Sequence, residues 1–239
     1  MVTKSELKYI QSLSDKKVRL ETGCFIAEGV KLVGEMIAAG YPLKAVYALD
    51  SWESPDTSIE VTRVEPFELE KMSLLQTPNQ VLAVAMMPQK PKEIDIAGQL
   101  TIVLDGIQDP GNLGTIIRTA DWFGVKQMLV SDDNAGLYNP KVIQSTMGSF
   151  LRVNVTQCNI ETVLTNTKLP VYGAVLSGAP LARTKMQAPC FLVIGNESKG
   201  IRTNLQPFIT HPVTIPSFGA AESLNAAVAT GILLSSWRS

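Results

Sequence analysis

The feature that most constrains the fold is a repeated order of strand, loop and helix that begins near residue 100. Short β-branched runs such as LTIVLDGI and QMLVS alternate with segments such as GNLGTIIRTADWFGV, whose apolar residues recur at helical spacing. The series continues through LPVYGAVL, PCFLVIGNE and HPVTIP to a final helix in SLNAAVATGILLSSW. This alternation predicts an α/β fold with a mostly parallel sheet that carries helices on both faces.

Residues 1–86 predict a smaller α/β domain. Two helical stretches open it, and VKLVGEMIAAG predicts a helix that ends near Gly40. The strand-like runs KAVYAL, IEVTRV and VLAVAMM surround a short helix in PFELEKMSLL. Residues 87–99 contain two prolines and few apolar residues, so they predict a linker, and residues 100–239 form the second predicted domain.

Charge and composition restrict the possible partners. Lys and Arg number 21 against 22 Asp and Glu, which excludes a uniform basic field for nucleic acid and leaves only local patches. One candidate patch lies in the first twenty residues, although a solvated helix face explains its charge equally well. Its basic residues are Lys4, Lys8, Lys16, Lys17 and Arg19.

Cysteine, histidine and hydropathy exclude further classes. Cys24, Cys158 and Cys190 show no CxxC spacing, so they are predicted to be small buried residues and neither disulfides nor zinc ligands. The single histidine, His211, cannot build a metal cluster, and we expect a structural role. No apolar run approaches the roughly 20 residues that span a bilayer, and the first residues lack a signal-type apolar stretch. We therefore expect a cytoplasmic protein without a membrane partner.

The first segment that could carry chemistry is DPGNLGTIIRTADWFG. Its apolar residues make one helical stripe, whereas Thr115, Arg118, Thr119 and Trp122 fall on a different face. Asn112 lies at the strand-to-helix turn, where glycine permits a tight backbone and helix N–H groups attract anions such as phosphate. A helix cap at Asn112 and a plain surface role for Arg118 are equally open.

The second segment, FLVIGNESKGI, is a predicted buried strand that breaks at Gly195 into a polar turn closed by Gly200. It has neither a Walker loop nor a GxGxxG fingerprint, which argues against a Rossmann-type nucleotide enzyme. Glu197 follows the carboxyl end of the strand, where open α/β sheets place ligand contacts. A plain turn is the alternative.

The third segment, VTIPSFGAAESLNAAVATGILLSSW, predicts a strand, a glycine-containing loop and a helix that starts near Ser223. Ser223 is suited to cap this helix. Asn225 is a polar residue at the head of a helix that is otherwise apolar almost all round. Helices without a polar face are usually buried in a core or a subunit interface. The apolar residues are Leu224, Val228, Ile232, Leu233 and Trp237.

In this order, the three segments resemble the three motifs of the SpoU/TrmH family of RNA ribose 2′-O-methyltransferases, within the SPOUT superfamily. The resemblance covers residues 100–239, including NPKVIQSTMGSFLRV, while GCFIAEGVKLVGEMI in the first domain resembles the L30-like substrate-binding domain often fused in front. It implies a deep C-terminal trefoil knot, an exception to the rule that chains are unknotted. It also implies S-adenosylmethionine as the cofactor.

The resemblance also implies the site. The expected catalytic residues are Arg118, Asn112, Glu197, Ser223 and Asn225. The expected cofactor-binding residues are Leu176, Ser177, Gly178, Gly195, Asn196, Glu197, Gly200, Ile215, Pro216, Ser223, Leu224 and Asn225.

The implied reaction transfers a methyl group to a ribose 2′-hydroxyl of RNA and needs no metal. The family's candidate for the proton step is Arg118, but a guanidinium group stays protonated in proteins and is a poor base. We therefore expect Arg118 to grip a neighbouring phosphate that receives the proton or polarises the hydroxyl. Asn112 and Glu197 would hold the geometry, while Ser223 and Asn225 would order the methionine end and the ribose.

The implied partners are RNA and a second copy of the chain. The L30-like domain favours ribosomal RNA over transfer RNA, and the apolar last helix together with the two-subunit sites of the family predicts a homodimer. A transfer RNA methyltransferase is one alternative. A non-catalytic RNA-binding protein with a degenerate methyltransferase fold is another, and the joint presence of the expected catalytic side chains counts against it.

Overall fold

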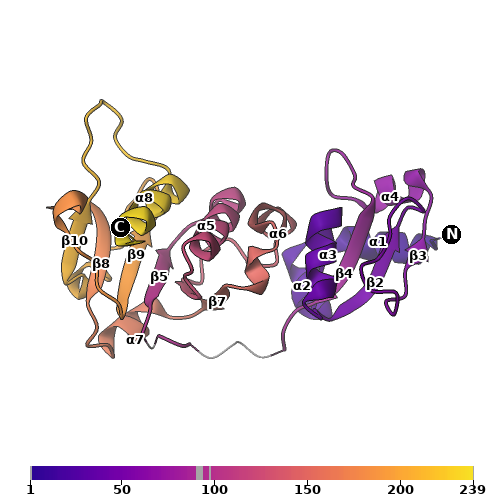
Figure 1. The fold of residues 1–239 in the computed structure, drawn as a ribbon, viewed down its shortest axis with the longest axis horizontal. Helices are drawn as coiled ribbons and strands as arrows, with labels where there is room; N and C mark the ends of the chain where they lie inside the picture. The colour runs from indigo at the N-terminus through magenta and orange to yellow at the C-terminus, as the bar shows by residue number, and fades with distance from the viewer. Residues whose placement is uncertain (1, 90–93, 97, 239) are drawn as a thin grey trace. The chain divides into compact units, whose positions relative to one another are not determined.

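A computed structural model describes residues 2–89, 94–96 and 98–238 (Figure 1). Residues 90–93 and 97 of the predicted linker lie outside the described residues. The chain forms two compact units: Met1–Pro91 with Gly136–Leu151, and Lys92–Ala135 with Arg152–Ser239. The predicted domain boundaries stay a prediction, and the structure adds that a segment from the middle of the chain packs with the first unit.

The first unit has a four-stranded sheet in the order β1-β4-β2-β3. Strands β1 and β2 pair antiparallel with β4, and β3 runs parallel to β2. The strands are β1 (Cys24–Glu28), β2 (Leu43–Ala48), β3 (Thr62–Arg63) and β4 (Val81–Met86). The helices before residue 90 are α1 (Lys4–Ser12), α2 (Lys16–Thr22), α3 (Val30–Ala38) and α4 (Pro66–Met72).

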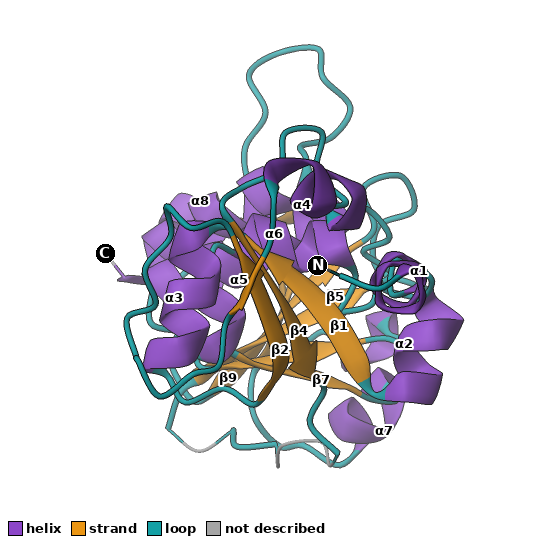
Figure 2. Ribbon diagram, turned by 90° about the vertical axis from the view of Figure 1, so that its right-hand side faces the viewer, coloured by secondary structure: helices purple, strands orange, loops and turns teal. Residues whose placement is uncertain are grey.

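Alternation along β4 divides the core of this unit into two layers. Leu82 and Val84 join a cluster with residues of α1 and α4, whereas Val81 and Ala83 join a cluster with residues of α3. Helices therefore cover both faces of the sheet, as Figure 2 shows with α3 and α1 on opposite sides of β1, β4 and β2.

The predictions for the first unit are confirmed in part. The helix in VKLVGEMIAAG is α3, and Gly40 follows it with φ +62°, a conformation that glycine adopts easily. The strand in IEVTRV was predicted too long, because only Thr62–Arg63 pair with a neighbour, at the edge of the sheet. The basic patch loses one member, since Arg19 is buried and donates to the carbonyls of Leu13 and Ser14.

The segment Gly136–Leu151 packs through aromatic rings. The Phe25 ring of β1 lies 4.8 Å from the Tyr138 ring and 6.1 Å from the Phe150 ring, measured between centroids. The segment contains α6 (Pro140–Thr146) and the 3-10 helix η1 (Ser149–Leu151). The helix ends earlier than NPKVIQSTMGSF predicted, because Met147 has φ +50° and Gly148 has φ +91°.

The second unit has a six-stranded sheet in the order β10-β8-β9-β5-β6-β7, in which all neighbours are parallel. The predicted α/β fold with a mostly parallel sheet is confirmed. The strands are β5 (Leu100–Asp105), β6 (Gln127–Val130), β7 (Asn154–Gln157), β8 (Val171–Pro180), β9 (Cys190–Gly195) and β10 (His211–Thr214). The helices are α5 (Pro110–Trp122), α7 (Ile160–Thr165), η2 (Leu181–Arg183), η3 (Gln206–Phe208) and α8 (Ala226–Arg238).

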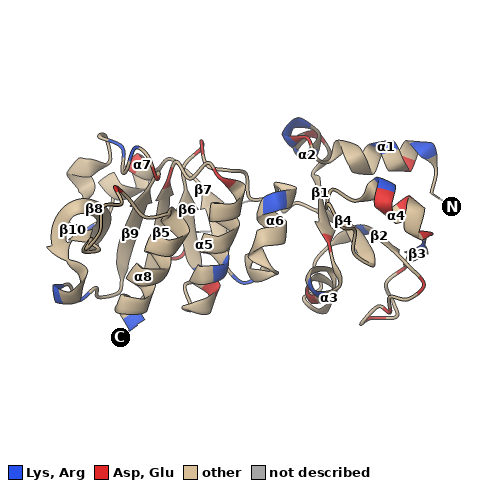
Figure 3. Cartoon of the chain, turned by 90° about the horizontal axis from the view of Figure 1, so that it is seen from above, with Lys and Arg blue, Asp and Glu red and all other residues tan. Residues whose placement is uncertain are grey.

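Helices lie on both faces of this sheet. Ile160 and Leu164 of α7 pack in one cluster with Val103 and Val193, while α5 and α8 lie together on the opposite face (Figure 3). The sequence patterns did not indicate β7 and α7, which are only four and six residues long. The trefoil knot stays a prediction.

The three cysteines are free; Cys24 and Cys190 are buried as predicted, and Cys158 is half-buried. Burial raises the pKa of the Cys190 thiol to about 11, as expected for an unreactive core thiol. In the described part of the chain, no helix is long and apolar enough to cross a bilayer.

Candidate functional site

The polar segments gather at the carboxyl ends of the parallel strands of the second unit. The Asp109 side chain caps α5 by accepting from the Asn112 N–H at 2.8 Å, and Pro110 occupies the first turn, where its missing N–H costs nothing. This cap places the Asn112 side chain at the start of α5, the helix that follows β5.

Two hydrogen bonds join the three predicted motifs. Asn225 donates its Nδ2 to Oδ1 of Asn112 at 2.9 Å, and Asn112 donates its own Nδ2 to Oε1 of Glu197 at 2.5 Å. The partners lie 113 and 85 positions apart in the sequence. The structure therefore brings together three of the five predicted catalytic residues in one polar chain.

Asn225 also begins the last helix. Its Oδ1 accepts from the N–H groups of Ala227 and Val228 at 3.0 and 3.3 Å. The predicted cap at Ser223 is wrong, because α8 begins at Ala226 and the nearer Asn225 satisfies the free N–H groups. Ser223 is exposed, and its side chain makes no hydrogen bond with any residue that the structure describes.

Arg118 lies on the exposed face of α5, as predicted. Thr115 is exposed on the same face, whereas Ile116, Ile117 and Ala120 are buried. Among the described residues, the Arg118 guanidinium has no hydrogen-bond or ion-pair partner. The side chain is thus available to an anion from outside the chain.

The turn after β9 is closed by its own groups. Asn196 donates Nδ2 to the Gly106 carbonyl at 2.8 Å, and its Oδ1 accepts from the N–H groups of Ser198 and Lys199. A side chain at Gly195 would meet the Gly200 backbone at 2.2 Å, so only glycine fits there. The Asn196 side chain, a predicted cofactor contact, is therefore committed to shaping the turn.

The ends of β8 and β10 also meet. Thr214 donates its hydroxyl to the Leu176 carbonyl at 3.1 Å, and a side chain at Gly178 would meet the Pro212 backbone at 2.6 Å. This contact places the predicted cofactor segment at residues 176–178 beside the segment that starts at Ile215.

The remaining predicted residues are not drawn into this arrangement. Residues 216–225 are exposed, and the connection between β10 and α8 is a long excursion away from the sheet (Figure 1). Phe218 in this loop is 99% exposed. Pro216, Ser223 and Leu224 therefore lie in an open loop, and only Asn225 at its end joins the polar chain.

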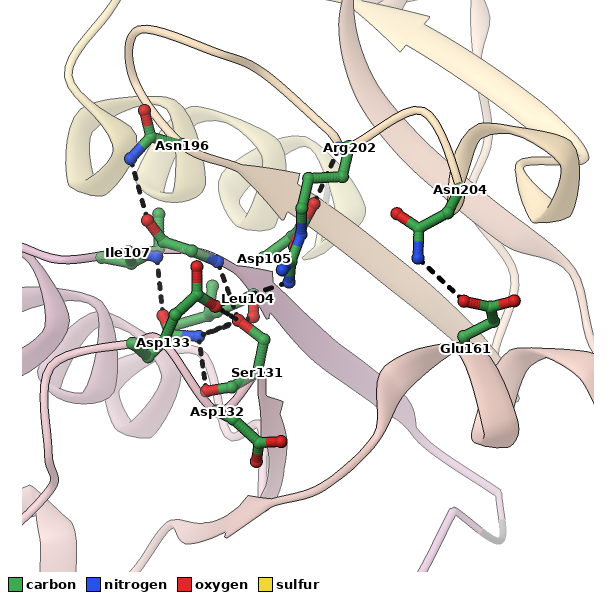
Figure 4. A network of polar contacts seen from close by, with 12 residues as sticks. Leu104, Asp105, Ile107, Ser131, Asp132, Asp133, Glu161, Asn196, Arg202 and Asn204 are labelled. Carbon is green, nitrogen blue, oxygen red and sulfur yellow. Dashed lines mark hydrogen bonds and ion pairs between the residues drawn. The ribbon is translucent and has the colours of Figure 1, made fainter.

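Sequence patterns missed an ion pair beside the site, between the buried Asp105 and the exposed Arg202. Asp105, the last residue of β5, has a fully buried side chain that accepts from Nε of Arg202 at 2.5 Å and from the Arg202 backbone N–H at 2.8 Å (Figure 4). The hydrogen bond to Asp105 raises the pKa of Arg202. Asp133 lies 3.5 Å from the same guanidinium, and a hydrogen bond from Ser131 lowers the pKa of Asp133. The pair ties the turn at residues 196–202 to the sheet.

The loop after β5 is fixed from its other side. Ser131 accepts from the Gly106 N–H at 3.0 Å, and Asn134 accepts from the Ile107 N–H at 2.7 Å. Because Asn196 holds the Gly106 carbonyl, the backbone before Asn112 is restrained by two neighbouring loops (Figure 4). The only sequence signal for these contacts was the position of Asp105 at the end of a buried strand.

No group of three or more His, Cys, Asp or Glu in the described part of the chain could hold a metal ion. The site offers amide, hydroxyl, backbone and guanidinium groups. These groups can bind phosphate, ribose and a zwitterionic ligand.

Comparison with known proteins places this chain among the RNA methyltransferases. The model of the SpoU rRNA Methylase family matches residues 99–235, and the model of the MRM3-like substrate binding domain matches residues 4–83. Because the first match covers more than half of the sequence, the chain belongs to the SpoU rRNA methylase family.

Individual relatives agree over the whole chain. The 23S rRNA (guanosine(2553)-2′-O)-methyltransferase RlmP of Bacillus subtilis (strain 168) is 32% identical over 236 residues, which cover 96% of this chain and 94% of the relative. A TrmH-family protein of Porphyromonas gingivalis has a solved structure with a TM-score of 0.88, 37% identity and full coverage of both chains. The AdoMet-bound rRNA methyltransferase of Sinorhizobium meliloti has a TM-score of 0.88 at 28% identity, covering 100% of this chain and 95% of that chain.

Proposed function

We propose that this chain is an S-adenosylmethionine-dependent methyltransferase that modifies a ribose 2′-hydroxyl of ribosomal RNA. The observation that carries the proposal is the polar chain Asn225–Asn112–Glu197 together with the exposed, unpaired Arg118, which lies on the same helix as Asn112. Relatives from Bacillus subtilis and Streptomyces viridochromogenes are both named as 23S rRNA 2′-O-methyltransferases, which supports the choice of RNA.

The segments around the site fit S-adenosylmethionine. Leu176 lies within β8 and is 81% exposed, and Leu224 before α8 is 45% exposed. Exposed apolar side chains beside backbone amides and carbonyls suit an adenine ring, which is flat and hydrogen-bonds at its edge. Asn225 and Ser223 offer polar groups for the methionine end. When bound, the cofactor supplies an electrophilic methyl group on a positively charged sulfur.

We assign Arg118 to the RNA. Its guanidinium can bind a phosphate beside the target ribose through two parallel hydrogen bonds. A phosphate oxygen held in this way would accept the hydroxyl proton or polarise the hydroxyl, which the guanidinium cannot do because it stays protonated. Asn112 and Glu197 then act as positioning residues, since they connect the start of α5 with the turn after β9.

We also propose that the protein is a homodimer. On the neighbouring helices α5 and α8, Trp122 is 86% exposed, Val228 51% and Ile232 38%. Burying these apolar side chains would contribute roughly 25 cal/mol per Å² of apolar area. A dimer with twofold symmetry would use the same face on both copies. Leu233, one of the predicted apolar residues of this helix, is buried within the unit and so is not part of the proposed interface.

The decisive experiment supplies isotope-labelled S-adenosylmethionine and RNA from cells that lack the protein. We expect label in ribosomal RNA at a ribose, located by mass spectrometry of nuclease fragments. Label in transfer RNA alone would overturn the choice of RNA. No label in any RNA, with no binding of cofactor by calorimetry, would favour a non-catalytic RNA-binding protein.

A further inference from the structure

A groove of about 550 Å³ opens at the β10 edge of the second unit. Its walls come from β8, from η2 with the turn that follows it, and from the start of β10. The side chains that matter below are Arg183, Lys185, His211 and Thr210, with Tyr172 beneath them. No residue that lines the groove is acidic.

The cations of this groove are not neutralised within the chain. Arg183 and Lys185 are exposed, and neither has an ion-pair or hydrogen-bond partner in the part of the chain that the structure describes. Elsewhere in the unit, Arg152 pairs with Asp121 at 2.8 Å and Arg202 pairs with Asp105. Because the whole chain has a net charge of −1, two unpaired cations on one groove are a local feature.

His211 is held in place beside them. Its Nδ1 lies 2.8 Å from the Thr210 hydroxyl, and its ring lies 4.8 Å from the Tyr172 ring, with 34° between the planes. These contacts fit the structural role expected from the sequence, but they leave Nε2 without a partner among the described residues. The groove therefore combines two cations with an imidazole that offers a polar ring nitrogen and an aromatic surface. Such a combination is typical of sites for single-stranded RNA.

The groove adjoins the candidate site through the chain itself. The lining residue Ala179 directly follows Gly178, and the lining residue Val213 directly precedes Thr214. Gly178 and Thr214 both take part in the contact between the ends of β8 and β10. A strand of RNA with one ribose in the candidate site can therefore continue across this edge of the sheet.

We propose that Arg183, Lys185 and His211 bind the backbone phosphate of the RNA substrate next to the target nucleotide. This inference rests on the proposed function, because it takes the RNA of that reaction as its ligand. Such contacts set the position and the salt dependence of binding and do not read the bases.

The first test compares two double variants. Arg183→Ala with Lys185→Ala removes the groove cations, and Lys126→Ala with Lys168→Ala removes two exposed lysines of the same unit as a matched control. For the groove variant we expect the dissociation constant for substrate RNA to rise roughly tenfold at physiological salt. The slope of log K against log salt should fall by about 1.4 if both cations contact phosphate of a single strand. Cofactor affinity, measured by calorimetry, should match the parent.

The second test uses the fact that His211 is the only histidine of the chain. In untagged protein its ring gives one set of NMR signals, which should shift when a short substrate RNA is added and should shift less in the groove variant. Inorganic phosphate alone is the comparison: saturation of the same shift at low millimolar phosphate would assign the groove to free phosphate.

The outcomes separate this inference from the proposed function. Equal RNA affinity and equal salt slopes in the groove variant and the control would contradict RNA binding in the groove. Methyl transfer by the parent would then still support the proposed function. A parent that binds no cofactor and methylates no RNA, yet loses RNA affinity in the groove variant, would overturn the function and keep an RNA-binding groove.

Discussion

The two units differ in how their buried charged groups are paired. In the first unit, Arg19 donates to two backbone carbonyls, and Glu28 accepts from one hydroxyl and one backbone N–H. In the second unit, the buried carboxylate of Asp105 instead pairs with a charged side chain, Arg202. Arg19 closes the turn before α2, and Glu28 fixes the residues after α4. Asp105 instead holds the turn that carries Glu197. The difference indicates that buried charge serves the fold in the first unit and the position of functional loops in the second.

The largest effect should come from Arg118, which belongs to no buried network. Arg118→Ala should reduce methyl transfer by about 100-fold or more, the scale for loss of a group that positions or polarises the reacting atoms. Thermal unfolding and cofactor affinity should change little, because the side chain is exposed and unpaired. Single-turnover methylation with substrate RNA measures the loss.

Arg118→Lys sharpens the test. Lysine keeps the charge but loses the two-pronged grip on phosphate, so activity should stay low. Near-normal turnover would mean that a point charge suffices. An Ala variant almost as active as the parent would remove Arg118 from the mechanism.

The next largest effect concerns the exposed apolar residues of the two units. Val228→Ala with Ile232→Ala removes about five carbon atoms from each copy, of which the dimer would newly bury roughly half because the two side chains are 51% and 38% exposed. At roughly 0.8 kcal/mol for each buried methylene, the proposed dimer should weaken by about ten- to a hundredfold for each copy. In the first unit, Leu20→Ala removes a side chain that is 64% exposed and should leave the mass unchanged. Light scattering over a dilution series measures the mass of each variant and of the parent. A parent that is a monomer of 25.9 kDa at micromolar concentration would contradict the dimer.

Asp105→Asn and Glu28→Gln compare the two buried carboxylates directly. Each change keeps the shape and should cost about 1–3 kcal/mol of unfolding free energy, because hydrogen-bond partners lose a charged acceptor. Only Asp105→Asn should also weaken cofactor binding, by about tenfold, since it loosens the turn at residues 196–202. Calorimetry at a temperature where both variants are folded measures this. Equal cofactor affinity in both variants would refute the distinction between the units.

The smallest effect is the pH dependence of Glu28. Burial raises its pKa above 4.5 and outweighs the hydrogen bonds from Ser73 and Leu74, which lower it. The folded state therefore holds this proton more tightly than the unfolded state, and stability is lost as pH rises from about 4.5 through the folded pKa. The stability cost of Glu28→Gln relative to the parent should therefore shrink as pH rises over this window. Chemical unfolding of the parent and the Glu28→Gln variant measures this. A difference in unfolding free energy between them that stays constant from pH 4 to 7 would contradict this assignment.

Local patterns predicted much of the fold and part of the site. Spacing of apolar residues in α5 placed Arg118 on the exposed face, and the buried runs of β5 and β9 were evident from composition. These features depend on neighbours three or four positions away, or on alternation along a strand, so the sequence carries them directly.

Contacts over long sequence distances depended on the tertiary structure. The pairing of Asp105 with Arg202 and the packing of Phe150 against Phe25 join segments that no periodicity connects. Motif order predicted that Asn112, Glu197 and Asn225 share a site. The parallel pairing of β5 with β9 brings Asn112 and Glu197 within hydrogen-bonding distance, because it aligns the carboxyl ends of strands that are far apart in the sequence. The packing of α8 against α5 then brings Asn225 to Asn112.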